Sequence, residues 1–145
     1  MSEDRQLHVS WEEFHQTVKA LALTIKDIKP WKGIVAVTRG GLVPASILAR
    51  ELDVRLIDTL CISSYCDKEN SQHTHEILKD LSFSGDDWLV VDDLVDTGAT
   101  MRLLRQRLPK AYYATVYAKP AGQAAVDTFV EPLSQETWIV FPWEE

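Results

Sequence analysis

Apolar residues near the start of the chain recur at alternating spacings of three and four, which is the period of one face of a helix. They are Trp11, Phe14, Val18, Leu21, Ile25 and Ile28. This pattern predicts an amphipathic helix over about residues 11–27 that ends before Pro30. Ser10 and Glu13 stand at its start with the spacing of a capping box.

The pattern then changes to short, mainly apolar runs, which are typical of strands buried on both faces of a parallel sheet. These runs occupy residues 34–37, 56–62, 88–91 and 112–118. Helix candidates lie between them at about residues 43–51 and 98–108, and Pro109 stops the second. Strands alternating with helices predict an α/β fold with four or five mainly parallel strands.

Two segments depart from this alternation. Residues 65–85 are mostly polar, and a polar stretch this long in a compact domain predicts a mobile loop. The tail from Thr137 contains Trp138, Phe141 and Trp143, and is too apolar for a free end. Since no repeat, low-complexity tract or linker divides the chain, we expect one domain over residues 1–145.

Composition narrows the class of partner. The net charge of −7 argues against nucleic acid, because binding to a phosphate backbone requires clustered Lys and Arg. Small phosphorylated ligands stay open, since backbone amides and a metal can hold them. Cys61 and Cys66 fit no zinc or redox motif, and unpaired thiols indicate a reducing compartment. With no signal peptide or membrane-spanning run in view, we expect a cytoplasmic protein.

Candidate chemistry gathers in residues 89–100, LVVDDLVDTGAT. An apolar strand runs into Asp92 and Asp93, and a short turn leads to a helix that opens with Thr-Gly-Ala-Thr. Ligands of open α/β sheets bind beyond the carboxyl ends of the strands, and a helix N-terminus suits a phosphate. The alternative is a solvated turn in which Asp96 or Thr97 caps the helix.

The number of carboxylates in this stretch favours a ligand site over a simple cap. Asp92, Asp93 and Asp96 fall within five residues at one helix mouth. Such carboxylates repel one another unless cations or sugar hydroxyls occupy the space between them.

Residues 90–100 resemble the phosphoribosyl-pyrophosphate motif of type I phosphoribosyltransferases. Other segments resemble the bacterial xanthine-guanine phosphoribosyltransferase subfamily: WKGI at 31–34, RGGLVP at 39–44, CISSY at 61–65, KPAG at 119–122 and TWI at 137–139. They occur in the family's order and cover nearly the whole chain. The resemblance implies the type I phosphoribosyltransferase fold, with a small C-terminal hood over about residues 120–145.

The resemblance also implies the reaction. Members transfer ribose 5-phosphate from phosphoribosyl pyrophosphate to a 6-oxopurine (guanine, xanthine or hypoxanthine) in purine salvage. Mg²⁺ serves as cofactor, and the products are a purine nucleotide such as GMP or XMP and pyrophosphate. Members usually form homotetramers or homodimers. Some associate peripherally with the inner membrane, although no basic amphipathic helix supports that association here.

Most of the site residues implied by the resemblance are expected to hold phosphoribosyl pyrophosphate. Arg39 and Gly40 match the loop that holds pyrophosphate, which in the family often carries a cis peptide bond that precedes no proline. Asp92 and Asp93 match the acidic pair that meets the ribose hydroxyls and the metal, with Asp93 as the metal ligand. The stretch that leads into and forms the 5′-phosphate cradle comprises Leu94, Val95, Asp96, Thr97, Gly98, Ala99 and Thr100. Asp92, Asp93, Asp96 and Arg39 are the expected catalytic residues.

The remaining implied residues read the purine. Asp96 matches the general base beside the imidazole nitrogen of the purine. Lys119 matches the ammonium that binds the 6-oxygen, Trp138 the ring stacked on the base, and Ile139 a backbone contact. Without the family, Lys119 would be interpreted as an exposed lysine at a strand end and Trp138 as part of the core.

The chain departs from the family pattern in three places. Residues 65–80 contain no arginine, only Lys68 and Lys79, although the family's mobile loop carries one that reaches pyrophosphate. Gln123 stands where members often have Arg, and the sequence stops at Glu145, short of the usual tail. His73 and His75 in the polar loop are interpreted as surface residues, because no further metal ligand is near them.

Two other functions stay open from the sequence. A non-catalytic regulator could sense phosphoribosyl pyrophosphate on the same fold, since fold and function are separable. Lys119 and Trp138 argue against it, because a pure sensor needs no residues that read a purine. An unrelated nucleotide-binding domain is disfavoured, because neither G-x-G-x-x-G nor G-x-x-x-x-G-K-[ST] occurs.

Overall fold

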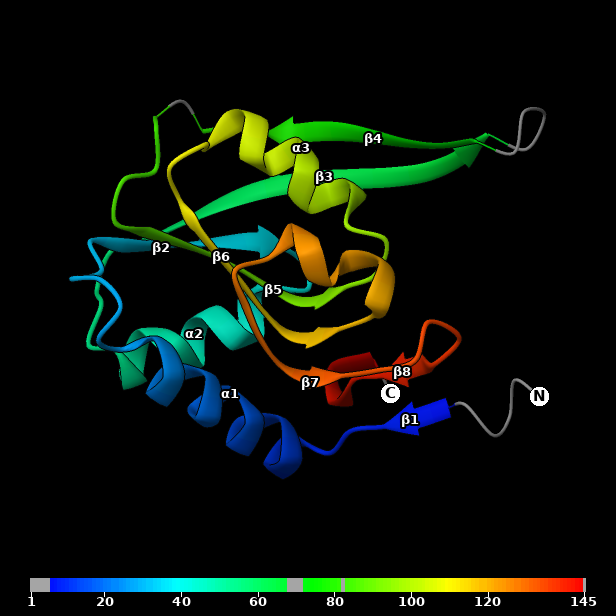
Figure 1. The fold of residues 1–145 in the computed structure, drawn as a ribbon, viewed down its shortest axis with the longest axis horizontal. Coiled ribbons are helices and arrows are strands. Elements are labelled where there is room, and N and C mark those ends of the chain that lie inside the picture. Colours follow the sequence, from blue (N-terminus) through cyan, green and yellow to red (C-terminus); the bar gives the residue numbers. More distant parts are fainter. Residues whose placement is uncertain (1–5, 68–71, 82, 145) are drawn as a thin grey trace.

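A twisted sheet with helices on both faces forms the body of the molecule (Figure 1). The computed structural model describes residues 6–67, 72–81 and 83–144. Helices α1 (Trp11–Ile25) and α2 (Leu42–Glu51) pack on one face, and α3 (Ala99–Arg107) packs on the other. The predicted α/β architecture is confirmed, but the expected number of four or five strands is too low, because the main sheet has six.

The main sheet has six strands in the order β4-β3-β2-β5-β6-β7. Every neighbouring pair runs parallel except β3 and β4. The strands are β2 (Gly33–Thr38), β3 (Ile57–Asp67), β4 (Gln72–Lys79), β5 (Trp88–Val95), β6 (Tyr112–Ala118) and β7 (Thr128–Pro132). A separate parallel pair joins β1 (Gln6–His8) to β8 (Trp138–Val140).

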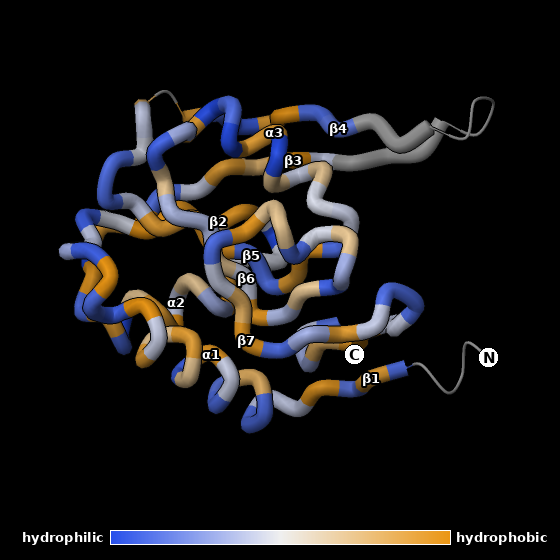
Figure 2. The backbone as a smooth tube through the Cα atoms, in the orientation of Figure 1, coloured by the Kyte–Doolittle hydropathy of each residue, from blue (hydrophilic) through white to orange (hydrophobic). Residues whose placement is uncertain are grey.

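Hydrophobic burial explains why the central strands are apolar on both sides. Ile34, Ala36, Leu89 and Val91 face the layer of α1 and α2, while residues of the same strands that alternate with them face α3. Helix α1 is amphipathic, and Figure 2 shows hydrophobic and hydrophilic residues alternating along it. Its capping box is present, with Ser10 Oγ accepting from the Glu13 backbone N–H at 3.1 Å.

The expectation of an irregular loop over residues 65–85 is wrong for most of that segment. Residues 65–67 continue β3, and β4 pairs antiparallel with it to form a long hairpin that projects from the sheet (Figure 1). A two-stranded ribbon outside the core can be polar on both faces, so its composition resembles that of a loop. Residues 68–71 and 82 lie outside the described ranges, and the mobility of the segment stays a prediction.

The acidic pair also lies differently from its expected position. Asp92 and Asp93 were expected after the strand, but β5 continues through them to Val95. The strand is longer because β6 keeps pairing with it, as Leu94 lies opposite Tyr117 and Val95 opposite Ala118. Both aspartates therefore have the fixed backbone of a sheet.

The C-terminal segment is anchored by aromatic packing. It contains the short helical turns η2 (Pro120–Ala125) and η3 (Pro142–Glu144) together with β7 and β8. Phe141 and Trp143 stack with ring centroids 4.7 Å apart, and both meet Phe14 of α1 edge-on. Within the described ranges, no helix has the length and apolar character needed to cross a membrane.

Thr115 gives a test of the packing in β6. Its side chain is fully buried, and its hydroxyl has no hydrogen-bond partner among the described residues. Thr115→Val should raise the free energy of unfolding by about 1–2 kcal/mol, because it removes a buried polar group without a partner. Denaturant unfolding measures the change.

Thr128→Val is the matched control, because the Thr128 hydroxyl is hydrogen-bonded to the Tyr112 hydroxyl. That substitution should lower the free energy of unfolding. A loss of stability in Thr115→Val as well would mean that the Thr115 hydroxyl is satisfied, for example by a buried water.

Candidate active site

Three chain segments converge where the parallel strands end. They are the loop from β2 to α2, the turn from β5 to α3, and the chain that leaves β6 and enters η2. The carboxyl ends of neighbouring parallel strands share one edge of the sheet, where α/β folds place their ligands. The predicted site residues fall on these segments, on the end of β5, on the first turn of α3 and on β8.

Asp92 and Asp93 place two carboxyl groups side by side near the end of β5. The Asp93 backbone N–H donates to Asp92 Oδ1 at 2.8 Å, and both side chains are half-buried. Burial raises the pKa of Asp92 well above its usual range, and the neighbouring charge of Asp93 adds to this. Burial also raises the pKa of Asp93, with the charge of Glu144 acting in the same direction. Two such carboxyls favour a cation between or beside them.

The loop after β2 packs directly against this pair. A Cβ atom on Gly40 would lie 2.7 Å from both carboxylate oxygens of Asp93, so any larger residue would have to displace that carboxylate. The peptide bond between Thr38 and Arg39 is cis, as the family resemblance implied, and Arg39 is exposed. The structure thus brings the predicted pyrophosphate loop and the acidic pair together.

The turn from β5 to α3 lines a cavity of about 480 Å³. Gly98 is the N-cap of α3 with φ of 91°, a left-handed conformation that glycine adopts without strain. The amides of a first helical turn lack partners within the helix, so those that no side chain caps are available to an anion. The lining residues are His75, Asp92, Leu94, Val95, Asp96, Thr97, Gly98, Ala99, Thr100 and Met101.

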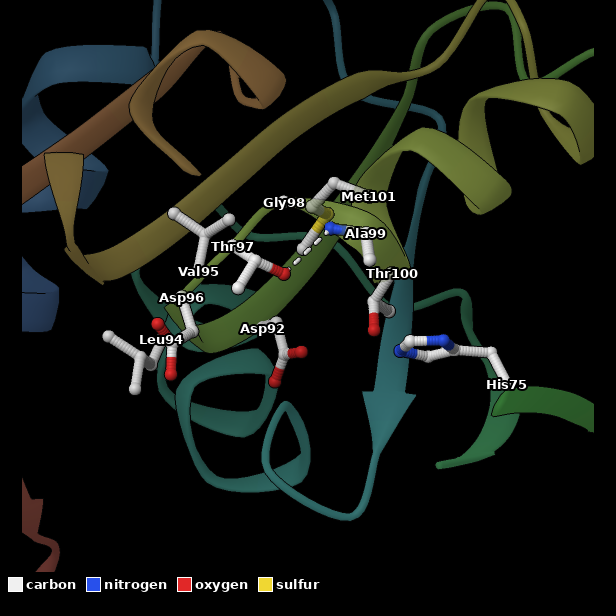
Figure 3. Close-up of a pocket in the computed structure, with 10 residues that line it drawn as sticks. All are labelled: His75, Asp92, Leu94, Val95, Asp96, Thr97, Gly98, Ala99, Thr100 and Met101. Atoms are coloured by element: carbon white, nitrogen blue, oxygen red, sulfur yellow. Dashed lines mark hydrogen bonds between the residues drawn. The ribbon is translucent and has the colours of Figure 1, made fainter. Parts of the chain in front are cut away.

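His75 belongs to this cavity although the sequence indicated a surface residue. It lies on β4, and Figure 3 shows its imidazole directed toward Thr100 from the opposite wall. The projecting hairpin carries it there, which is a long-range effect with no local signal in the sequence. The side chain of His73, which was given the same interpretation, lies outside the described residues.

Asp96 is held between two other side chains. Its Oδ2 lies 3.4 Å from Lys119 Nζ, and its Oδ1 accepts from Gln135 Nε2 at 2.7 Å. Asp96 is therefore not the helix cap that the sequence left open, whereas the Thr97 hydroxyl accepts from the backbone N–H of Ala99, the first residue of α3, at 3.3 Å. Lys119 is only 7% exposed, so its alternative interpretation as an exposed lysine is also wrong.

Trp138 and Ile139 lie on β8, and neither is among the described residues that line this cavity. Ile139 is buried among core residues of the α1 layer, whereas Trp138 is 66% exposed. The alternation of a strand turns one side chain inward and the next outward. The core interpretation of Trp138 is wrong, and its ring is free to contact a ligand.

Gln135 is a second functional candidate that the sequence did not reveal. Besides its bond to Asp96, its Oε1 accepts from the backbone N–H of Ala121 at 2.9 Å. Asp96 and Gln135 are 39 positions apart in the chain. No motif joins them, so only the tertiary structure could place them together.

Comparison with known proteins agrees with this geometry. Residues 10–145 match the phosphoribosyl transferase domain family. The xanthine-guanine phosphoribosyltransferase of Nitratidesulfovibrio vulgaris strain DP4 is 54% identical over 136 residues, which cover 94% of this chain and 83% of that protein. The enzyme of the same name from Desulfotalea psychrophila is 54% identical over 140 residues, covering 97% and 87%.

Solved structures agree in fold. The purine phosphoribosyltransferase from Pyrococcus horikoshii Ot3 superposes with a TM-score of 0.83 at 26% identity, covering 97% of this chain and 95% of that one. The sheet and the helices described above therefore have the same architecture as that enzyme. Because the family match extends over nearly the whole sequence and the identity to its members exceeds one half, this chain belongs to the phosphoribosyl transferase domain family.

Proposed function

We propose that the protein transfers ribose 5-phosphate from phosphoribosyl pyrophosphate to a 6-oxopurine, guanine or xanthine, and releases pyrophosphate. The observation that carries this proposal is the buried Lys119 paired with Asp96 beside a phosphate cradle. A buried ammonium and a carboxylate on one edge offer a donor and an acceptor to a purine. The relatives named above support the same purines through their names.

The acidic pair fits Mg²⁺. Among the described residues, no cluster of three or more His, Cys, Asp or Glu side chains has the arrangement of a metal cage. Mg²⁺ does not need such a cage, since it keeps several waters and is held by one or two carboxylates plus substrate oxygens. Asp93, with Asp92 beside it, would hold the ion, which when bound neutralises charge on the departing pyrophosphate.

The residues of the chain divide the remaining work. Arg39 and the backbone amides of its loop bind pyrophosphate and stabilise it as it leaves. Thr97 and Thr100, with the first amides of α3, bind the 5′-phosphate and fix the ribose. The anomeric carbon then develops oxocarbenium character, and the purine nitrogen attacks it.

Asp96 and Lys119 act on the purine. Lys119 donates a charge-assisted hydrogen bond to the 6-oxygen, and Asp96 accepts a proton from the ring nitrogen. These two side chains face each other, with Lys119 Nζ 3.4 Å from Asp96 Oδ2. A purine that binds here meets a donor and an acceptor that are already adjacent, so the two side chains need little rearrangement. Trp138 would stack on the base, with Ile139 as a backbone contact.

His75 supplies a further group that can bind phosphate. The hairpin has no arginine, and His75 of β4 lines the cavity together with Thr97 and Thr100. An imidazole N–H donates to a phosphate oxygen, and the charged ring does so more strongly. We propose that His75 binds phosphoribosyl pyrophosphate. A homodimer or homotetramer stays a prediction from the family.

The first prediction from this function concerns activity. The purified protein with phosphoribosyl pyrophosphate, Mg²⁺ and guanine or xanthine should release pyrophosphate. A chelator should stop the reaction and added Mg²⁺ restore it, because the acidic pair holds the ion only together with substrate oxygens. A coupled pyrophosphate assay measures the rate. Binding of phosphoribosyl pyrophosphate without turnover of guanine, xanthine or hypoxanthine would favour the regulator instead.

A second prediction concerns the choice of purine. Lys119 has three donors and no acceptor, so adenine's 6-amino group would set donor against donor and leave a buried ammonium N–H without an acceptor. Adenine should be used less efficiently by roughly 10⁴-fold, as for sites built to bind one polar group. Lys119→Gln should lower kcat/KM for guanine and narrow the difference from adenine, since an amide can also accept.

The exposed Lys110 lies at the opposite end of β6, so Lys110→Gln is the matched control and should leave both purines unchanged. The ratio of kcat/KM for guanine to that for adenine is the measurement. A ratio unaffected by Lys119→Gln would mean that Lys119 does not read the 6-position.

A third prediction concerns His75. His75→Ala should raise KM for phosphoribosyl pyrophosphate by roughly tenfold, the loss expected for one hydrogen bond to a charged group. His75→Arg should keep KM near the native value, because a guanidinium also binds phosphate. KM for guanine should not change. His15→Ala, at an exposed position on α1, controls for loss of a histidine. If His75→Ala leaves KM for phosphoribosyl pyrophosphate unaltered, His75 has no part in binding.

A further inference from the structure

Gln135 connects three parts of the site. It lies in the turn between β7 and β8, and its amide reaches both Asp96 on the turn after β5 and Ala121 in η2. The distances are 2.7 Å from Nε2 to Asp96 Oδ1 and 2.9 Å from the Ala121 N–H to Oε1. A single side chain thus fixes the C-terminal segment against the proposed base.

The chemistry of the partners determines the orientation of the amide. The Ala121 backbone N–H is a donor and requires the oxygen, while an ionised Asp96 accepts only and requires the nitrogen. The two contacts therefore agree on one of the two possible flips. Reversing the amide would set donor against donor and acceptor against acceptor.

Asp96 needs this support because much of its side chain is open. The side chain is 55% exposed, whereas that of its other partner, Lys119, is 9% exposed. A carboxylate held at one oxygen can still turn, but donors at both oxygens fix its plane. The carboxylate offers about four lone-pair sites, so two bonds leave acceptor capacity for a purine N–H.

We infer that Gln135 is a positioning residue that acts through Asp96, holding the carboxylate in the orientation in which it takes the purine proton. The inference rests on the proposed role of Asp96 as the base. Gln135 also precedes Trp138 by three positions, and the turn between them is closed by the Thr137 N–H donating to the Ser134 carbonyl at 3.1 Å. These hydrogen bonds therefore also fix the position of Trp138, whose ring is exposed, relative to Asp96.

Two substitutions separate the contact to Asp96 from the contact to Ala121. Gln135→Glu keeps an acceptor for the Ala121 N–H but loses the donor to Asp96, and Gln135→Leu loses both. Each should lower kcat by roughly ten- to hundredfold, the size expected for a hydrogen bond to a charged group. KM for phosphoribosyl pyrophosphate should stay within about twofold of native, because the phosphate cradle is not touched.

Ser134→Ala is the matched control. It removes the hydrogen bond between the Ser134 and Thr137 hydroxyls in the same turn without touching Asp96, and should leave kcat unchanged. If Gln135→Glu keeps native kcat while Gln135→Leu loses it, Gln135 only tethers the C-terminal segment and the inference is wrong.

A double-mutant cycle with Asp96→Ala tests whether Gln135 acts through Asp96. In the Asp96→Ala background, Gln135→Glu should change kcat by less than about twofold, because the group it positions is gone. If Gln135→Glu lowers kcat in the Asp96→Ala background by the same factor as in the native protein, the inference is wrong. Native turnover in Asp96→Ala itself would refute the proposed base, which is a separate failure.

An observation that does not depend on activity completes the test. The side-chain amide signal of Gln135 in the ¹⁵N–¹H NMR spectrum, assigned by its loss in Gln135→Leu, should shift in Asp96→Ala. It should not shift in Ser134→Ala. If the amide signal does not shift in Asp96→Ala, the contact between Gln135 and Asp96 does not exist in solution.

Discussion

Two neighbouring carboxyl groups stand half-buried at the end of the central strand β5, and much of the site is arranged around their charge. Folding raises the pKa of both Asp92 and Asp93, chiefly through burial. At low pH both carboxyls are protonated in the folded and unfolded chain, and no stability is lost. As the pH rises, the unfolded chain releases these protons first, so the free energy of unfolding falls until the folded carboxyls also ionise. A cation at this position lowers the free-energy cost of ionising these two carboxyls.

The surrounding backbone follows from this constraint. Gly40 leaves the space that Asp93 occupies, so the loop after β2 can approach the acidic pair with its amides and Arg39. Gly98 turns the chain sharply into α3, which directs the first amides of that helix toward the same cavity. Negative charge on one side and anion-binding amides on the other suit a substrate that carries both phosphates and sugar hydroxyls.

A second interaction network ties this centre to the C-terminal segment. Asp96 contacts Lys119 from the end of β6 and Gln135 from the turn before β8. The segment is held from the other side by Phe141 and Trp143, which pack on Phe14 of α1. Helix α1 is far from the chemistry in sequence, yet its apolar face stabilises the element that carries Trp138. Asp96 as the proposed base, Lys119 and the exposed ring of Trp138 are thereby positioned by one hydrogen-bonded and hydrophobically anchored unit.

The sequence by itself determined the elements whose signals are local. Periodicity predicted α1, capping predicted its start at Trp11, and continuous apolar runs predicted the buried strands. The family motif identified the acidic strand end, because neighbouring residues in one stretch carry it. The hairpin of β3 and β4 escaped prediction, since a polar ribbon outside the core has no hydrophobic period. Tertiary structure alone decided that Lys119 is buried, that Trp138 is exposed, and that Gln135 and His75 reach the site. Those outcomes depend on contacts between residues far apart in the chain. Such contacts produce no regular spacing of residue types, so they cannot be predicted from the sequence pattern.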